Sequence, residues 1–237
     1  MTNNKRTSRA VLAAAALLVL VGLSVSAVLL GRGDGREPST GPIATGPSRV
    51  AEPEASATKP PAVDAEPLNA EPEAVSWELF QGVALPSSRT DGPTRVEGPV
   101  HAGFSRTPTG ALLADAQISA RTLVDTDVEN LRQVSEAQLA EGPGKTAYLN
   151  LLRQLDGRND PPATGYAQIA GFRFITYTPD LAVISRATRD HSGRLQASTD
   201  TLRWENGDWK LEKPTSGLQQ PQVVQDLSGY VPWSGIS

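Results

Sequence analysis

Residues 141–146 have the residue types of a phosphate-binding loop, Glu-Gly-Pro-Gly-Lys-Thr. In such a loop, backbone N–H groups surround the phosphates and the lysine neutralises their charge. The motif also needs a glycine five positions before its second glycine, here Gly144, and a strand ahead of the loop. Position 139 is leucine, and a helix is predicted to precede the loop. We therefore expect residues 141–144 to break a helix rather than to bind a nucleotide.

Metal binding and nucleophilic catalysis find equally little support. The two histidines, His101 and His191, lie far apart in the chain, which has no cysteine, so the usual zinc ligands are lacking. Asp190, His191 and Ser192 are the residue types of a catalytic triad, but neighbours in a tight turn point apart. No pair of carboxylates stands out from the surface acids. The sequence thus predicts no catalytic, cofactor-binding or metal-binding residue.

The elements around these residues follow from capping and periodicity. Thr107 is expected to cap a helix that has Pro108 in its first turn, because that pair is a frequent helix start. Asp125 or Asp127 is expected to cap the next helix. Apolar residues at helical spacing predict three helices, over residues 108–124, from about 125 to 140, and over 145–155.

Beyond residue 165 the apolar residues alternate, which predicts strands. Residues 76–85 are expected to form a short strand or extended entry segment. The clearest local feature is Asn206-Gly207, the preferred pair for a two-residue type I′ hairpin. It places Trp204 opposite Trp209 and Leu202 opposite Leu211, all four on one face. The strands of the main sheet are expected over residues 166–177, 181–189, 194–205 and 208–213.

Helices followed by an antiparallel sheet of about four strands predict the α+β class. The order of elements and the closing Trp-x-x-Gly-x-Trp hairpin look like the nuclear-transport-factor-2-like cone, in which a curved sheet wraps around N-terminal helices. The C-terminal residues 230–233 are expected to fold back onto the domain, and residues 76–237 to form one domain.

Several segments resemble an uncharacterised family of membrane-anchored ectodomains encoded on conjugative elements of high-GC Gram-positive bacteria. The most specific of them is Thr-Pro-Thr-Gly-Ala-Leu-Leu-Ala at 107–114. The resemblance implies a part of a conjugative or type IV secretion-like apparatus, in which anchored cone domains act as assembly factors. It supplies no functional residues. The resemblance is carried by residues 77–86, 103–114, 177–180 and 204–209.

Some enzymes with the cone fold use an acid or a tyrosine inside a pocket. Tyr166, Tyr177 and Asp115 are the residues of this chain that could line one. We expect all three to pack in the core or at its rim instead.

The N-terminus predicts a membrane anchor. Lys5, Arg6 and Arg9 precede residues 10–30, which carry no charge. A helix of that length spans about 31 Å, which matches a hydrocarbon core of about 30 Å. The positive-inside rule places residues 1–9 in the cytoplasm and the C-terminal domain outside. A cleavable signal peptide is the alternative, but the apolar run continues beyond the cleavage site that could be recognised at residues 25–27.

Residues 31–75 predict a disordered linker. They are rich in proline, glutamate and alanine and hold almost no large apolar residue, so they cannot bury enough surface to offset chain entropy. The chain has a net charge of −4, most of it in this linker. A weakly acidic domain is a poor candidate for direct nucleic-acid binding, which needs a basic surface.

These features together predict a single-pass protein of the cell membrane that acts as a non-enzymatic assembly or scaffold subunit of a conjugative apparatus. Its expected partners are the membrane and other envelope subunits, with a second copy as a further candidate and no small-molecule ligand. Two alternatives stay open: an extracytoplasmic ligand carrier or enzyme that uses the cone pocket, and an accessory subunit of a lipid-import system.

Overall fold

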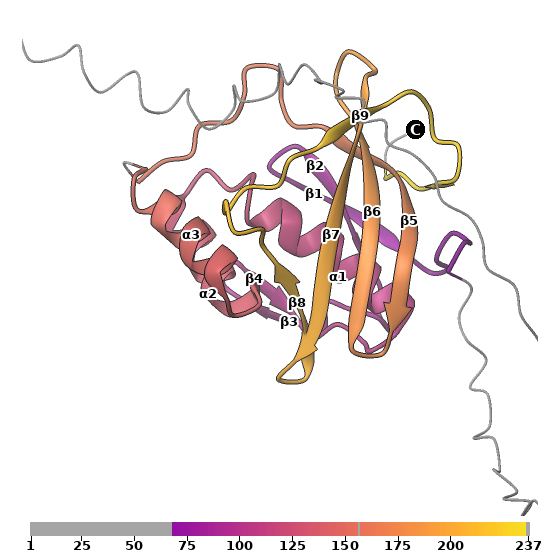
Figure 1. Cartoon of the computed structure of the whole chain (residues 1–237), viewed down its shortest axis with the longest axis horizontal. Helices are drawn as coiled ribbons and strands as arrows, with labels where there is room; N and C mark the ends of the chain where they lie inside the picture. Colours follow the sequence, from indigo (N-terminus) through magenta and orange to yellow (C-terminus); the bar gives the residue numbers. More distant parts are fainter. Residues whose placement is uncertain (1–67, 156, 236–237) are drawn as a thin grey trace, which may run out of the picture.

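A computed structural model describes residues 68–155 and 157–235. Within them, three helices and a mostly antiparallel set of strands form an α+β structure, as the sequence predicts (Figure 1). No helix in these ranges is long and apolar enough to cross a membrane. The predicted anchor at 10–30 and most of the predicted linker lie outside the described residues.

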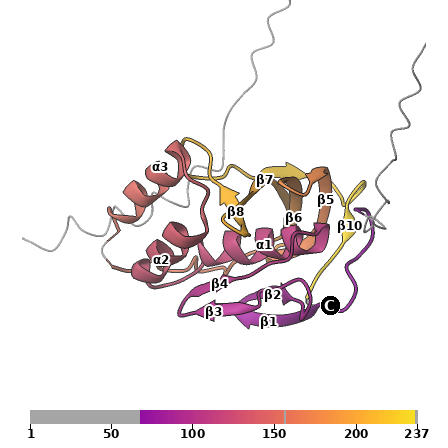
Figure 2. The ribbon, with the colours of Figure 1, turned by 90° about the horizontal axis from the view of Figure 1, so that it is seen from below.

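Helix α1, Pro108–Arg121, is buried around nearly its whole circumference. Half of its residues are Ala, Leu or Gly, as expected of a helix that is covered on all sides. It lies between the main sheet and two small hairpins (Figure 2). Thr107 is its N-cap and accepts a hydrogen bond from the Gly110 N–H, which confirms the predicted start. The helix ends three residues earlier than expected, where the Thr122 hydroxyl donates to the Ile118 carbonyl.

Helices α2, Val128–Gln138, and α3, Pro143–Leu152, lie side by side beyond the β8 side of the sheet (Figures 1 and 2). Asp127, one of the two predicted caps, accepts a hydrogen bond from the Glu129 N–H. Helix α3 begins two residues earlier than expected. Gly144 there packs against the Lys213 carbonyl so closely that a Cβ would collide with it. Residues 139–142 separate the two helices, which confirms the predicted break at residues 141–142, whereas residues 143–144 already belong to α3.

The main sheet has the order β10-β5-β6-β7-β8, and β9 pairs with β7. The four long strands match the predicted ones to within two residues at each end. The C-terminal tail adds the other two, which makes six strands rather than four. The strands are β5 (Gln168–Thr178), β6 (Leu181–Arg189), β7 (Leu195–Glu205), β8 (Asp208–Glu212), β9 (Gln222–Val224) and β10 (Val231–Pro232).

The β7–β8 hairpin has the predicted turn and register. Asn206 and Gly207 both have positive φ, at 54° and 79°, as a type I′ turn requires. Trp204 pairs with Trp209 and Leu202 with Leu211. Three of these four side chains are fully buried, and Trp204 is half-buried.

The segment at 76–87 differs from its prediction, because it forms a hairpin rather than one strand. Strands β1, Ser76–Phe80, and β2, Val83–Ser87, pair antiparallel. Gln81 and Gly82 both have positive φ and reverse the chain. A second small hairpin pairs β3 (Arg95–Glu97) with β4 (Val100–Ala102).

The C-terminal tail folds back onto the domain, as predicted. Val231 pairs with Phe172 of β5, and Trp233 is buried with its ring 5.5 Å from that of Phe172. The Tyr230 hydroxyl lies 2.9 Å from the Ser185 hydroxyl on the sheet face that points away from α1.

Candidate functional site

The sheet face that covers α1 is the place where a cone-shaped fold would hold a pocket, and here side chains occupy it. Phe172, Ile184 and Trp209 are among its fully buried members. The indole N–H of Trp209 donates to the Ser105 carbonyl at 2.8 Å. Tyr177 packs its ring 6.2 Å from that of Trp209, and its hydroxyl donates to the Arg106 carbonyl.

A buried ionic cluster interrupts this apolar face. Arg186 of β6 donates from Nη1 to Asp115 Oδ2 of α1 at 3.1 Å, and from Nη2 to Asp200 Oδ2 of β7 at 3.0 Å. The exposed fractions of the three side chains are 11%, 0% and 6% respectively. Gln219 donates to the second oxygen of Asp200 at 2.9 Å. We call Asp115, Arg186 and Asp200 the buried triad.

Sheet register brings the two strand residues of the triad together. Ile184 pairs with Asp200, and Arg186 lies two residues further along β6 on the same face. The two charged side chains are therefore diagonal neighbours that both point at α1. Asp115 lies in the middle of α1, and its own backbone carbonyl also accepts from Arg186 at 3.0 Å.

The environment of the triad changes the pKa of Asp115. Burial raises the pKa of Asp115 well above its usual range, because the charged form loses its water. Arg186 opposes this rise and the neighbouring Asp200 adds to it. Burial alone would lower the pKa of Arg186, but Asp115 and Asp200 hold it above its ordinary value.

Lys213 places a fourth charge next to the triad. Its Nζ donates to the Thr122 hydroxyl at 3.2 Å and lies 4.9 Å from the centre of the Tyr148 ring. Burial lowers the pKa of Lys213 to about 8. The Tyr148 hydroxyl donates to the Thr122 carbonyl, and burial raises the pKa of that phenol. The domain thus holds a buried acid, Asp115, and a half-buried base, Lys213, whose pKa values are displaced toward each other.

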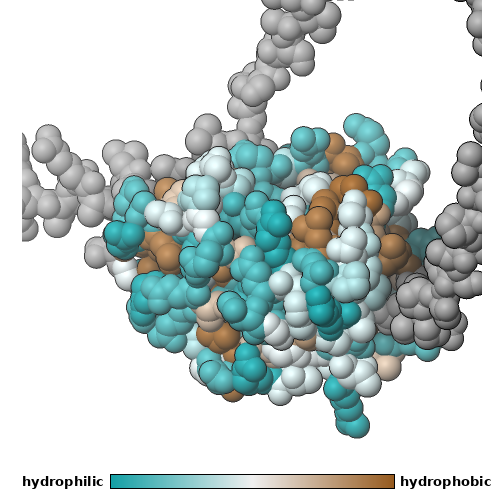
Figure 3. Space-filling model, turned by 60° about the horizontal axis from the view of Figure 1, so that its bottom comes forward, coloured by the Kyte–Doolittle hydropathy of each residue, from teal (hydrophilic) through white to brown (hydrophobic). Residues whose placement is uncertain are grey.

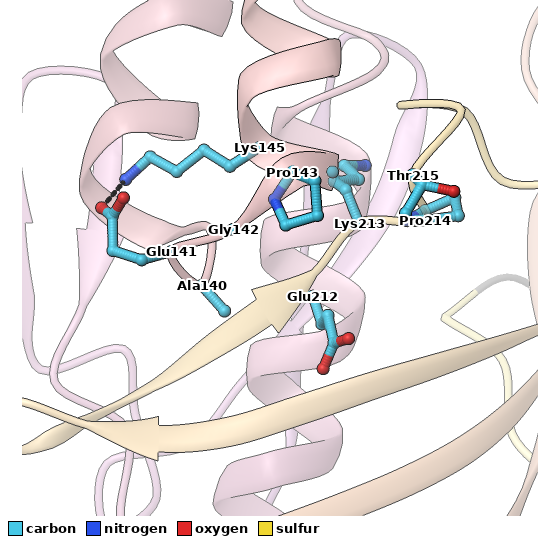
Figure 4. Close-up of a pocket in the computed structure, with 10 residues that line it drawn as sticks. Ala140, Glu141, Gly142, Pro143, Lys145, Glu212, Lys213, Pro214 and Thr215 are labelled. Atoms are coloured by element: carbon cyan, nitrogen blue, oxygen red, sulfur yellow. Dashed lines mark hydrogen bonds and ion pairs between the residues drawn. The ribbon is translucent and has the colours of Figure 1, made fainter.

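A surface groove of about 260 Å³ lies where α3 meets the end of β8 (Figure 4). Its lining includes Gly142, Gly144 and Lys145 of the sequence that resembles a phosphate loop, together with Lys213. Lys145 points away from the groove toward Glu141, where the two side chains form an ion pair at 2.6 Å. It also donates to the Glu136 carbonyl at 2.7 Å. The lysine therefore joins α2 to α3.

The triad-like residues at 190–192 form a turn, as predicted. Asp190 Oδ1 accepts from the backbone N–H and the hydroxyl of Ser192, at 2.9 and 2.6 Å, while His191 is exposed. His101 lies on β4, in a different hairpin. Within the described ranges no group of three or more His, Cys, Asp or Glu residues could hold a metal ion.

The three residues proposed for a cone pocket are not brought together. Asp115 belongs to the buried triad and Tyr177 to the aromatic part of the same sheet face. Tyr166 packs instead against a separate apolar cluster formed by Val83, Leu85 and Val124.

Sequence reasoning missed Arg186, Asp200 and Lys213. A signal was present for two of them, because Arg186 and Asp200 occupy inward positions of alternating strands, where apolar residues are expected. Their partner Asp115 was expected in the core or at its rim, but not in an ion pair. The pairing itself joins residues 71 and 14 positions apart, which no local pattern predicts.

Comparison with known proteins identifies a family but no better characterised relative. The model of a family described as a domain of unknown function, DUF8175, matches residues 38–232, most of the chain. No curated protein and no solved structure matches the chain.

Proposed function

We propose that this chain, which belongs to the DUF8175 family, is a non-enzymatic, membrane-anchored assembly or scaffold subunit of a cell-envelope complex. A conjugative, type IV secretion-like apparatus is the system we favour, because of the resemblance carried by residues 77–86 and 103–114. We further propose that the domain is a nuclear-transport-factor-2-like cone. Three helices that precede a sheet covering α1 support this assignment.

The scaffold proposal rests on one observation: side chains fill the side of the sheet that faces α1. Phe172, Ile184 and Trp209 fill its apolar part at 1%, 0% and 0% exposure. The buried triad occupies much of the rest, and its charges are satisfied by one another and by Gln219. A sheet face that is filled in this way stabilises a rigid domain. A rigid domain suits a protein that binds its partners through its outer surface.

The outer surface offers apolar side chains for protein contacts. Leu79 of β1 is 74% exposed, Val223 of β9 57% and Ile175 of β5 52%. The face seen from below shows apolar patches among polar residues (Figure 3). Exposed apolar groups next to polar ones are typical of interfaces that form between folded subunits.

Photocrosslinking in intact membranes tests the proposal. A photoreactive residue is placed in the full chain at Leu79, Ile175 or Val223, with the exposed Arg89 as the matched polar position. We expect at least one apolar position to capture other membrane subunits, with Arg89 capturing less. Recovery of the chain only as a free monomer from every position would contradict a scaffold role.

One observation favours a second candidate function, a small-ligand carrier or enzyme. The buried acid Asp115 and the half-buried base Lys213 have displaced pKa values, which is a frequent property of functional sites. Native mass spectrometry of the full chain, purified from its membrane, tests this candidate. A bound small molecule that is lost in both Asp115→Asn and Lys213→Met would favour it, and identical ligand-free spectra for all three proteins would exclude it.

A further inference from the structure

A groove of about 390 Å³ lies at the edge of the main sheet, where the described chain begins. One side is formed by Leu68 and Asn69, and the other by Arg173 and Phe174 of β5 together with residues 229–231. The groove therefore lies between the end of the predicted linker and the C-terminal tail.

The chemistry of the groove is aromatic and cationic. The guanidinium of Arg173 lies 5.0 Å from the centre of the Tyr230 ring, and Tyr230 is fixed by its contact with the Ser185 hydroxyl. Arg173 is exposed, and no carboxylate in the described part of the chain forms an ion pair with it. Aromatic grooves of this kind bind extended, proline-rich segments, and a free arginine selects for acidic ones.

The groove also borders a part of β5 beyond the end of its pairing with β10. Strand β10 pairs with Gly171 and Phe172, and among the described strands none pairs with Arg173 or Phe174 on that side. An extended segment in the groove can therefore contact backbone groups of β5 as well as the side chains of Arg173 and Tyr230.

The residues that lead into the groove fit it. Residues 60–67 read Pro-Pro-Ala-Val-Asp-Ala-Glu-Pro, with three prolines, two acids and no base. They connect directly to Leu68, which already lines the groove. The family match begins at residue 38 and so includes this segment, thirty residues ahead of the described domain. Because the family match extends this far, we infer that the segment belongs to the same unit as the domain.

We propose that residues 60–67 bind in this groove of their own chain, with Asp64 or Glu66 paired to Arg173. If residues 10–30 are the membrane anchor that the sequence predicts, this binding leaves residues 31–59 between the anchor and the bound segment. It also fixes the side of the domain from which the spacer leaves. The proposal concerns the orientation of the domain and does not depend on the scaffold role.

Disulfide formation in the full chain tests the proposal, because the natural sequence has no cysteine. Val63→Cys reports on the segment and Ser228→Cys on the groove rim. We expect rapid cross-linking within one chain. Arg173→Glu should slow it about five-fold, the effect of losing roughly 1 kcal/mol of ion-pair and cation–π interaction. Arg89→Glu, a charge reversal at an exposed arginine outside the groove, should leave the rate unchanged.

A charge swap completes the test. Arg173→Glu combined with Asp64→Arg and Glu66→Arg should restore rapid cross-linking, and circular dichroism checks that each variant is folded. A rate that does not respond to Arg173→Glu would overturn the proposal. So would a product consisting mainly of disulfide-linked dimers, because the segment would then bind a second copy. Neither result bears on the photocrosslinking of other subunits.

Discussion

Two ionic clusters in this domain share one design and differ in their surroundings. In the buried triad, Arg186 holds Asp115 and Asp200 at 3.1 and 3.0 Å. On the exposed face of α2, Arg132 holds Glu129 and Glu136 at 2.8 and 2.5 Å. The buried side chains are 0–11% exposed, whereas those on α2 are 41–54% exposed. Each of the two clusters consists of one arginine between two carboxylates.

The difference in burial reverses the direction in which the carboxylate pKa moves. Hydrogen bonds from Arg132 lower the pKa of Glu129 to about 2, because water still solvates the charged form. Burial raises the pKa of Asp115 despite an arginine at similar distance. An ion pair therefore stabilises ionised carboxylates at the surface, whereas in the interior the cost of removing water exceeds the attraction.

The largest expected effect comes from removing the buried cation. Arg186→Met leaves Asp115 and Asp200 buried without a counter-charge, and we expect a loss of about 3–5 kcal/mol in the free energy of unfolding. Denaturant unfolding followed by tryptophan fluorescence measures it. Adding Asp115→Asn and Asp200→Asn should recover much of the loss. Equal losses in Arg186→Met and Arg132→Met would show that the two clusters do not differ in this way.

The pH dependence of stability sharpens the comparison. Because the pKa of Asp115 is raised from 3.8 in the folded state, the folded protein binds more protons above that pH than the unfolded chain does. Its contribution to stability is therefore complete below pH 3.8 and is lost as pH rises through the folded pKa. Asp115→Asn should remove this decline. If the free energy of unfolding changes with pH in the same way for the natural protein and Asp115→Asn between pH 4 and 8, the raised pKa of Asp115 is contradicted.

Lys213 gives a smaller effect at higher pH. Its pKa is lowered from 10.5 to about 8, so between these values the unfolded chain binds more protons and stability rises with pH. Lys213→Met should abolish that rise, as measured by unfolding at pH 7.5, 9 and 10. Arg89→Met, which removes one positive charge from an exposed side chain, is the control for general effects of charge. If stability rises with pH to the same extent in Lys213→Met, another group is responsible for the rise.

The smallest effect is expected on α2. Arg132→Met and Glu129→Gln should leave neutral-pH stability unchanged within error, because exposed ion pairs contribute little and are screened by salt. The lowered pKa of Glu129 stabilises the fold above pH 4.5, and this contribution is lost as pH falls toward about 2. Acid unfolding of Glu129→Gln at low ionic strength measures it. A large loss in the free energy of unfolding at neutral pH would show that the exposed cluster on α2 contributes as much to stability as the buried triad.

The features predicted correctly from sequence depend on neighbouring residues. Thr107 and Asp127 cap helices because each side chain reaches an N–H two or three residues later. Asn206-Gly207 closes a hairpin because both residues adopt positive φ readily. The hairpin at 76–87 was missed, because Gln81 adopts positive φ there without being a residue type that favours it.

Sequence alone determined where the three helices, the four long strands and the closing hairpin form, since capping, periodicity and turn chemistry act over a few residues. Only the tertiary structure decided that Asp115, Arg186 and Asp200 meet, and that the acid holds its proton more tightly than a free aspartate. Ionisation depends on how much water the folded chain removes from a group and which charges it brings near. Both depend on packing between distant segments, and no single segment of the sequence specifies that packing.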